Sequence, residues 1–157
     1  MKLYRFSPIQ SKEQLLKVIT YVAKRNSKLC KKIIGKTLPI KSLTIFTHYP
    51  NEYEQLIKIA LELGAKLKEH NGLYVTLNEP IKVGKHTITQ LRIRQPDPYR
   101  MHVGCNDFEI NDYEAFKREY LDKCPNNLRA IKRPEYEMIE FFDPDFDTLA
   151  YVVNGDV

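Results

Sequence analysis

A row of lysines near the start of the chain recurs with the period of a helix. Spacings of seven, four and three residues place four side chains on one helical face: Lys17, Lys24, Lys28 and Lys31. Such a row neutralises phosphates and releases their counterions, which fits nucleic acid or another anionic surface. The alternatives are a solvated helix face and a face that docks on an acidic part of the chain.

Two arginines farther along alternate with apolar residues. Arg92 and Arg94 follow Leu91 and Ile93 in turn, so both arginines lie on one face of a predicted strand. Guanidinium groups bind carboxylates and phosphates through paired hydrogen bonds. This face therefore predicts contact with an anion, and a solvated sheet face is the alternative.

The histidines, cysteines and acids form no complete catalytic or metal motif. His102 and Cys105 are three positions apart in a predicted strand and point to opposite faces, which excludes a nucleophile–base pair within that strand. The acids of Asp143-Pro-Asp-Phe-Asp147 lack the Gly and Glu of a calcium loop and predict a polar turn. The chain's three cysteines contain no Cys-x-x-Cys pair, so we predict neither a disulfide framework nor a zinc site.

Composition and charge describe one folded domain with an uneven charge distribution. The chain has 157 residues, of which 43% are hydrophobic and 29% charged, and its net charge is +5. Residues 1–41 contain eleven Lys or Arg and one acid, whereas residues 42–157 are net acidic. We predict a basic N-terminal extension, 1–41, on an acidic body, 42–157. The absence of a long apolar run predicts no membrane span, and the cysteine usage favours a cytoplasmic protein.

The basic extension is predicted to form an amphipathic helix. Ser11 followed by Gln14 is typical of an N-terminal capping box, and Gly35 suits a left-handed helix end. Apolar residues at helical spacing form a stripe that must face a core or a partner: Leu15, Ile19, Val22, Leu29 and Ile33.

The rest of the chain is predicted to be one β-α-β-β-β module written twice, over residues 42–98 and 101–154. Asn51-Glu-Tyr-Glu and Asn111-Asp-Tyr-Glu are 60 residues apart, and each predicts a helix capped by its Asn. β-like runs precede and follow both helices. We therefore predict an α+β fold; chance recurrence of a capping pattern is the alternative to a repeat.

These paired modules resemble the vicinal oxygen chelate superfamily, which includes glyoxalases, extradiol dioxygenases and bleomycin-resistance proteins. The second module carries the likeness, with His102-Val-Gly at the start of a strand, Asn111-Asp-Tyr-Glu-Ala-Phe at a helix start and Phe141-Phe-Asp-Pro-Asp before the final strand. The resemblance implies a curved mixed sheet around a cleft. A ferredoxin-like duplication is the alternative fold.

The resemblance also implies where a metal would be bound, because metal enzymes of the superfamily take ligands from the first and last strands of each module. Those places hold Ser42 or Leu43, Gln90, His102 and Ala150. Two of the four places therefore hold no suitable ligand. A divalent ion needs several convergent donors. We therefore predict no metal and no cofactor. A metal-dependent lyase or dioxygenase centred on His102 is the alternative.

The leading prediction is a non-metal binding module whose cleft takes a small molecule or a protein partner. The site strands of the superfamily place four residues in that cleft: Gln90, Arg92, His102 and Tyr136. Nucleic-acid binding by the lysine row is the second hypothesis and predicts an affinity that falls steeply with salt. A protein partner that binds the apolar and basic faces of residues 12–34, such as a second copy of the chain in a homodimer, is a further hypothesis. Whether the chain is an enzyme stays open, because one scaffold hosts many activities.

Overall fold

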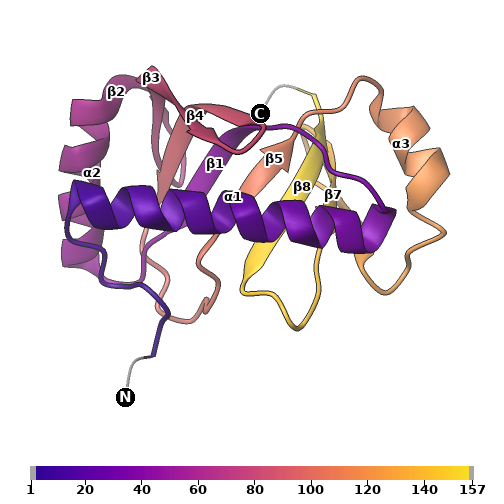
Figure 1. Ribbon diagram of the computed structural model, residues 1–157, viewed down its shortest axis with the longest axis horizontal. Helices are drawn as coiled ribbons and strands as arrows, with labels where there is room; N and C mark the ends of the chain where they lie inside the picture. Colours follow the sequence, from indigo (N-terminus) through magenta and orange to yellow (C-terminus); the bar gives the residue numbers. More distant parts are fainter. Residues whose placement is uncertain (1–2, 156–157) are drawn as a thin grey trace.

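A computed structural model describes residues 3–155 as an α+β protein with three helices and eight strands (Figure 1). The helices are α1 (Lys12–Ile34), α2 (Pro50–Leu63) and α3 (Tyr113–Tyr120). The strands are β1 (Ile40–Phe46), β2 (Gly64–Glu69), β3 (Gly72–Val83), β4 (His86–Arg94), β5 (Gly104–Phe108), β6 (Leu128–Lys132), β7 (Glu137–Phe141) and β8 (Thr148–Asn154). Within this part of the chain, no helix is long and apolar enough to cross a membrane.

The strands form one open mixed sheet in the order β2-β3-β4-β1-β5-β8-β7-β6. β1 pairs with β4 and β5 pairs with β8 in parallel, whereas β1 and β5 pair antiparallel at the centre. The remaining pairs are antiparallel. This order places β4, β1, β5 and β8 side by side in the middle of the sheet.

The helices share one apolar core with the sheet. α1 crosses the middle of the sheet and contacts β1, β5 and β8, while α2 packs on β2, β3 and β4 and α3 lies against β8 (Figure 1). The buried face of α1 is the apolar stripe of the sequence: Leu15, Ile19, Val22 and Leu29 are fully buried, and Ile33 is partly buried against the core. Burial of such side chains stabilises the helix position by about 1.5–3 kcal/mol each.

The ends of α1 follow from local sequence. The Ser11 Oγ atom accepts a hydrogen bond from the Gln14 N–H at 3.1 Å, and Gly35 ends the helix with a φ of 80°. In a capping box the Gln14 side chain would accept a hydrogen bond from the Ser11 N–H. Here it accepts from the N–H of Gln10, one residue earlier, at 2.8 Å.

The caps predicted for the other two helices are wrong by one or two residues. α2 begins at Pro50 with Tyr49 as its N-cap, not with Asn51, because proline suits the first helical position. α3 is capped by Asp112, whose Oδ1 accepts from the Ala115 N–H at 3.0 Å, and not by Asn111. Asn and Asp cap equally well, so the sequence does not decide between neighbours.

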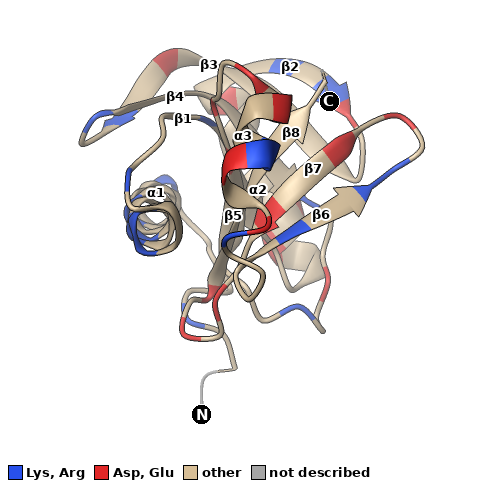
Figure 2. Cartoon of the chain, turned by 90° about the vertical axis from the view of Figure 1, so that its right-hand side faces the viewer, with Lys and Arg blue, Asp and Glu red and all other residues tan. Residues whose placement is uncertain are grey.

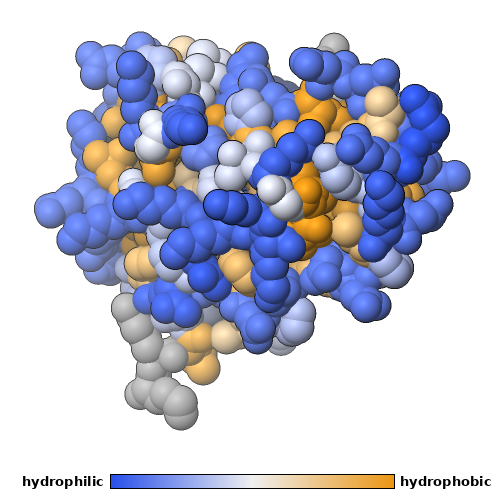
Figure 3. Space-filling model, turned by 45° about the vertical axis from the view of Figure 1, so that its right-hand side comes forward, coloured by the Kyte–Doolittle hydropathy of each residue, from blue (hydrophilic) through white to orange (hydrophobic). Residues whose placement is uncertain are grey.

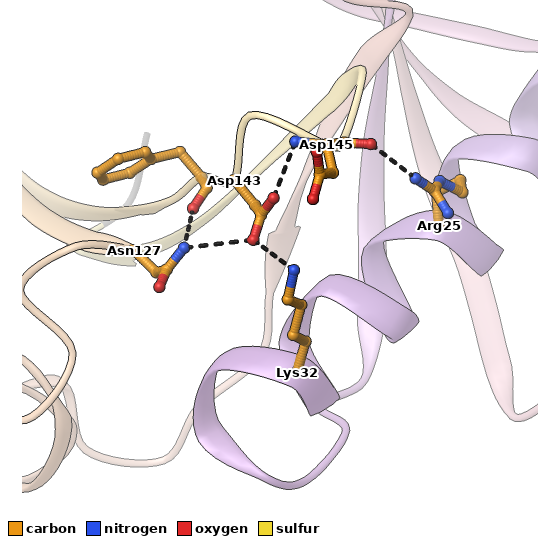
Figure 4. A network of polar contacts seen from close by, with 6 residues as sticks. Arg25, Lys32, Asn127, Asp143 and Asp145 are labelled. Atoms are coloured by element: carbon orange, nitrogen blue, oxygen red, sulfur yellow. Dashed lines mark hydrogen bonds and ion pairs between the residues drawn. The ribbon is translucent and has the colours of Figure 1, made fainter.

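The acidic turn of residues 143–147 holds α1 in place (Figure 4). Lys32 Nζ lies 2.8 Å from Asp143 Oδ2, and Arg25 donates to the Asp145 carbonyl at 3.2 Å. The Lys32 hydrogen bond is the main reason that the pKa of Asp143 is lowered. Asp147 accepts from Tyr21 at 2.7 Å. The turn therefore receives two of the basic side chains of the helix, although the lysine row takes no part.

Gly104 lets α1 approach the centre of the sheet closely. A Cβ atom there would lie 2.4 Å from the Thr44 carbonyl oxygen and 3.1 Å from Val22 Cγ2. We expect Gly104→Ala to lower the free energy of unfolding by about 1–3 kcal/mol, because neither the β1 backbone nor the buried helix has room to withdraw. Urea unfolding measures the change. An unchanged midpoint would show that the sheet relaxes around the methyl group.

Candidate functional site

The candidate site lies on the sheet face that the helices leave open. Side chains alternate along each strand, so the residues between those in the core point to this face. Tyr74 of β3 and Met138 of β7 line the same cavity, although four strands separate β3 from β7. In a flat sheet these strands would be about 24 Å apart. The sheet therefore curves around a cleft.

One end of this cleft, which we call the arginine lobe, is a cavity of about 310 Å³ lined by four arginines and one acid. Arg92 and Arg94 come from β4, Arg100 from the segment before β5, and Arg133 from the turn between β6 and β7. The acid is Asp107 of β5. Within residues 3–155, none of the four arginines forms an ion pair with a carboxylate. The lobe therefore has an uncompensated positive charge.

Aromatic rings hold three of these guanidinium groups in position. Arg92 Cζ lies 5.0 Å from the ring centre of Tyr74. Arg94 Cζ and Arg100 Cζ lie 5.0 and 5.6 Å from the ring centre of Phe46. Arg92 also donates to two main-chain carbonyls of the turn between β2 and β3, at 2.9 and 3.3 Å. A stacked guanidinium keeps a fixed plane and presents its edge N–H groups to a ligand.

The electrostatics of the arginine lobe favour a bound anion. Burial lowers the pKa of Arg94, and the neighbouring charges of Arg100 and Arg92 lower it further. Burial raises the pKa of Asp107 to about 6, whereas Arg92 acts in the opposite direction. The Asp107 side chain is exposed and lines the cleft. An anion would offset the cost of the clustered positive charge.

The other end, which we call the apolar lobe, is a cavity of about 650 Å³ that shares Arg100, Arg133, Met138 and Tyr151 with the arginine lobe. Most of its remaining wall is apolar: Ile131, Phe142, Pro144, Phe146 and Leu149. The two lobes therefore form one continuous cleft.

Apart from the shared Arg100 and Arg133, the charged groups in the apolar lobe are already compensated. Glu140 is buried and accepts hydrogen bonds from Tyr151 Oη at 2.8 Å and Arg129 Nε at 2.7 Å. His102 also lines this lobe, and its pKa is lowered by burial and then by Arg100, which favours the neutral ring. Its Nδ1 atom is buried and has no hydrogen-bond partner among residues 3–155.

The structure divides the four residues predicted for the cleft. Arg92 and Tyr136 line the arginine lobe, and His102 lines the apolar lobe. Gln90 points to the same side of β4 as Arg92 but lines neither lobe. Both Arg92 and Arg94 can be found from the sequence, because they alternate with apolar residues along the strand.

Sequence reasoning missed most of the other cleft residues. Asp107 is next but one to Cys105 in β5, so strand alternation places both on the same face. Arg133 lies in a turn beside a proline, and no pattern in the sequence connects it to β4. Arg100 follows Tyr99 in the linker and lines both lobes. Tyr99 itself is 92% exposed and lines neither lobe.

The positions at which the superfamily resemblance implies metal ligands do not fit a divalent cation. Ala150 is fully buried in the helix-side core, and the neighbours that line the cleft on β8 are Leu149 and Tyr151. His102 precedes β5 instead of beginning that strand. In the described part of the chain, no three His, Cys, Asp or Glu side chains come together in a group that could hold a metal ion. The nearby arginines would also repel a cation.

The lysine row lies on the outside of the molecule. Lys17, Lys24, Lys28 and Lys31 are all exposed on α1. Figure 2 views this helix nearly end-on and shows its many Lys and Arg positions. The row is therefore accessible to a partner, and it lies on the opposite side of the sheet from the cleft.

A separate cavity of about 400 Å³ lies between residues 36–39 and α3. Figure 3 turns this side of the molecule forward and shows a strip of apolar surface among hydrophilic side chains. The charged residues that line the cavity include Glu109, Asp112 and Glu119 together with Lys36. This mixture points to no particular ligand, so the cleft remains the candidate site.

No family model and no curated protein matches the sequence. Among solved structures, the structural-genomics protein EC4020 is similar with a TM-score of 0.68 at 13% identity, over 94% of this chain and 93% of that one. At that identity the likeness shows the fold alone. A glyoxalase/bleomycin resistance protein/dioxygenase superfamily member from Vibrio splendidus 12B01 has a TM-score of 0.46 at 12% identity, over 74% of this chain and 97% of that one.

Proposed function

We propose that this chain is a non-metal binding module whose cleft binds a small organic anion. The observation that carries the proposal is the arginine lobe, where four guanidinium groups meet without an ion-paired carboxylate. The buried Nε atom of Arg92 also lacks a hydrogen-bond partner among the described residues. A carboxylate or phosphate would satisfy these donors with charge-assisted hydrogen bonds.

The dimensions of the cleft support a ligand of small-molecule size. Ligand pockets commonly have volumes of about 300–1,000 Å³ and combine apolar walls with a few convergent polar groups. The arginine lobe has about 310 Å³, and both its donors and its aromatic walls face the cavity. This combination fits a bound metabolite better than it fits a flat protein interface.

Calorimetric titration of the protein with inorganic phosphate and with acetate at pH 7 tests the proposal. We expect saturable binding of one anion per chain, with moderate dependence on salt. A variant with the lysine row changed to glutamine is the control, because it removes positive charge from the opposite side of the sheet. Equal loss of binding in that variant would show that the anion does not occupy the cleft.

The raised pKa of Asp107 gives the proposed binding a pH dependence. The carboxylate is ionised at pH 7 and repels an anion, and it becomes neutral as the pH falls through about 6. We expect sulfate, whose charge is constant in this range, to bind roughly fivefold more tightly at pH 5 than at pH 7, because the repulsion is on the order of 1 kcal/mol.

Asp107→Asn separates this effect from protonation of other groups in the cleft. His70 and His102 also line the two lobes, so the pH dependence of the unmodified protein alone does not identify Asp107 as its cause. The Asn variant should bind sulfate at pH 7 as tightly as the unmodified protein does at pH 5. If the Asn variant retains the full pH dependence, the histidines and not Asp107 cause it.

Nucleic acid is a second candidate ligand, supported by the exposed lysine row. Arg25 and Lys32 of the same helix are engaged by the acidic turn, whereas the four lysines of the row point away from the sheet. A short single-stranded oligonucleotide should then bind with a log–log salt slope of roughly −0.7 per neutralised phosphate. Changing the four lysines to glutamine should abolish this binding, and changing Arg94 to glutamine should not alter it.

We also propose that the two halves of the chain are repeats of one module. Strand order supports this, since β2-β3-β4-β1 in one half corresponds to β6-β7-β8-β5 in the other. The first and last strands of both halves pair in parallel. The arginine lobe is built from both halves, so we expect neither half alone to bind phosphate in the same titration.

A further inference from the structure

The cleft has an apolar floor that continues from the arginine lobe into the apolar lobe. Phe46, Cys105 and Leu149 form a small buried cluster separate from the main core that the helices share, with Phe142 and Tyr151 packed against it. Phe46 and Cys105 line the arginine lobe, whereas Leu149 and Phe142 line the apolar lobe. A ligand bound among the arginines can therefore extend along apolar surface into the apolar lobe.

Beyond Arg100 and Arg133, which it shares with the arginine lobe, the apolar lobe has no unpaired Asp, Glu, Lys or Arg side chain for a ligand among the described residues. Glu140 is paired with Arg129, whose guanidinium lies 5.0 Å from the ring centre of Phe142. Asp143 is held by Lys32 and by the Asp145 N–H at 2.8 Å. A charged ligand group placed beyond the two shared arginines would lose water without gaining a charged partner. An uncharged group would cover apolar surface at no such cost.

We infer that the ligand is an elongated carboxylate, with its anionic head in the arginine lobe and an uncharged apolar tail in the apolar lobe. This inference rests on the proposed function, because it needs the head to be bound by the arginines. Arg100 and Arg133 line both lobes and mark where head and tail join. Burial of each tail methylene group should then contribute to affinity.

Calorimetric titration with acetate, butyrate, hexanoate and octanoate at one pH and ionic strength tests the inference. We expect the affinity to rise about fourfold for each methylene group that enters the apolar lobe. Octanoate should then bind at least a hundredfold more tightly than acetate.

Two variants locate the tail and the head. Ile131→Ser makes the wall of the apolar lobe polar, so it should reduce the ratio of octanoate to acetate affinity about tenfold. Ile81→Ser is the matched control, because Ile81 is also a half-buried strand isoleucine but lines a cavity outside the cleft. Arg94→Gln should weaken octanoate binding at least tenfold.

The outcomes separate the two proposals. If acetate and phosphate bind and octanoate binds no more tightly, the elongated ligand is wrong and the anion-binding cleft stands. If octanoate binds Arg94→Gln as well as the unmodified protein, the head does not lie among the arginines and the inference is also wrong. If no anion binds, the proposed function fails and the inference fails with it.

Discussion

Replacing Arg94 with glutamine is expected to weaken phosphate binding about 10- to 100-fold without destabilising the protein. Hydrogen bonds to charged groups contribute about 1.5–3 kcal/mol each, which corresponds to this loss. Arg94 forms no ion pair within residues 3–155, so its guanidinium is available to a ligand. Arg94 lines the arginine lobe, and its Cζ atom lies 5.0 Å from the ring centre of Phe46.

Arg94→Gln should raise the free energy of unfolding while it lowers the affinity for phosphate. The pKa of Arg94 is lowered by burial, Arg100 and Arg92, which means that folding disfavours the charged form. At pH 7 the guanidinium remains charged, so this charge costs folding free energy and a neutral glutamine removes the cost. A residue with a purely structural role would show the reverse, with lower stability on substitution. Binding sites commonly trade stability for function in this way.

Thermal unfolding and phosphate titration of the same samples measure both effects. Lys24→Gln is the matched control, because it also removes one positive charge but from the exposed side of α1. We expect the control to change phosphate affinity less than twofold at physiological salt, where distant charges are screened. Equal weakening in the two variants would mean that net charge and not the cleft attracts the anion.

Replacing Glu52 with alanine is expected to lower the free energy of unfolding by about 2–5 kcal/mol. Glu52 is only 2% exposed, and its two carboxylate oxygens accept hydrogen bonds from different parts of the chain. One accepts from the Ile9 N–H at 2.6 Å and the other from the His48 N–H at 2.7 Å. Alanine would leave both buried N–H groups without an acceptor, at about 1–3 kcal/mol each.

This carboxylate links the N-terminal segment to the start of α2. Glu52 lies in the first turn of the helix, where a negative charge also suits the helix dipole. Ser7 Oγ lies 2.6 Å from His48 Nδ1, and the Tyr4 ring stacks on His48 with centroids 3.9 Å apart. Loss of the carboxylate should therefore loosen the whole contact between residues 4–9 and the end of β1.

Urea unfolding measures the effect, with Glu52→Gln and Glu54→Ala as companions. The glutamine variant keeps one oxygen acceptor and should fall between the other two proteins. Glu54 is exposed on the same helix, so its removal should change stability by no more than about 0.5 kcal/mol. If Glu52→Ala is as stable as Glu54→Ala, water or rearranged neighbours satisfy the two N–H groups.

Local periodicity predicts those parts of the fold whose physical cause is local. The apolar spacing in α1 and the alternation of Arg92 and Arg94 with Leu91 and Ile93 depend on helix and strand geometry alone. The structure shows the helix over Lys12–Ile34 and turns both arginines away from the core. Features that depend on one residue are less certain, since either of two adjacent polar residues can cap a helix. The superfamily resemblance puts Ala150 at a ligand position, whereas the structure buries it in the core, and a shift of one residue is enough to reverse the face of a strand.

No local pattern in the sequence identifies β2 as a strand. Its residues, Gly64–Glu69, alternate only weakly and follow α2 without a loop. Gly64 has the extended φ of −165°, and a Cβ there would lie 2.2 Å from the Thr76 carbonyl oxygen. This close approach exists only when β3 is already in place. Long-range pairing, and not local preference, therefore makes this segment a strand.

Local periodicity is enough to predict the α1 helix, its two faces and the common side of Arg92 and Arg94, because 3.6-residue and two-residue periods are properties of a single segment. The meeting of Arg100 and Arg133 with those arginines around one cavity depends on how distant segments pack. That convergence requires the antiparallel pairing of β1 with β5 and the curvature of the sheet, which bring together residues far apart in the chain. The tertiary structure likewise decides that the acidic turn engages Arg25 and Lys32 of α1 and leaves the lysine row exposed, because the position of the turn depends on where β8 pairs.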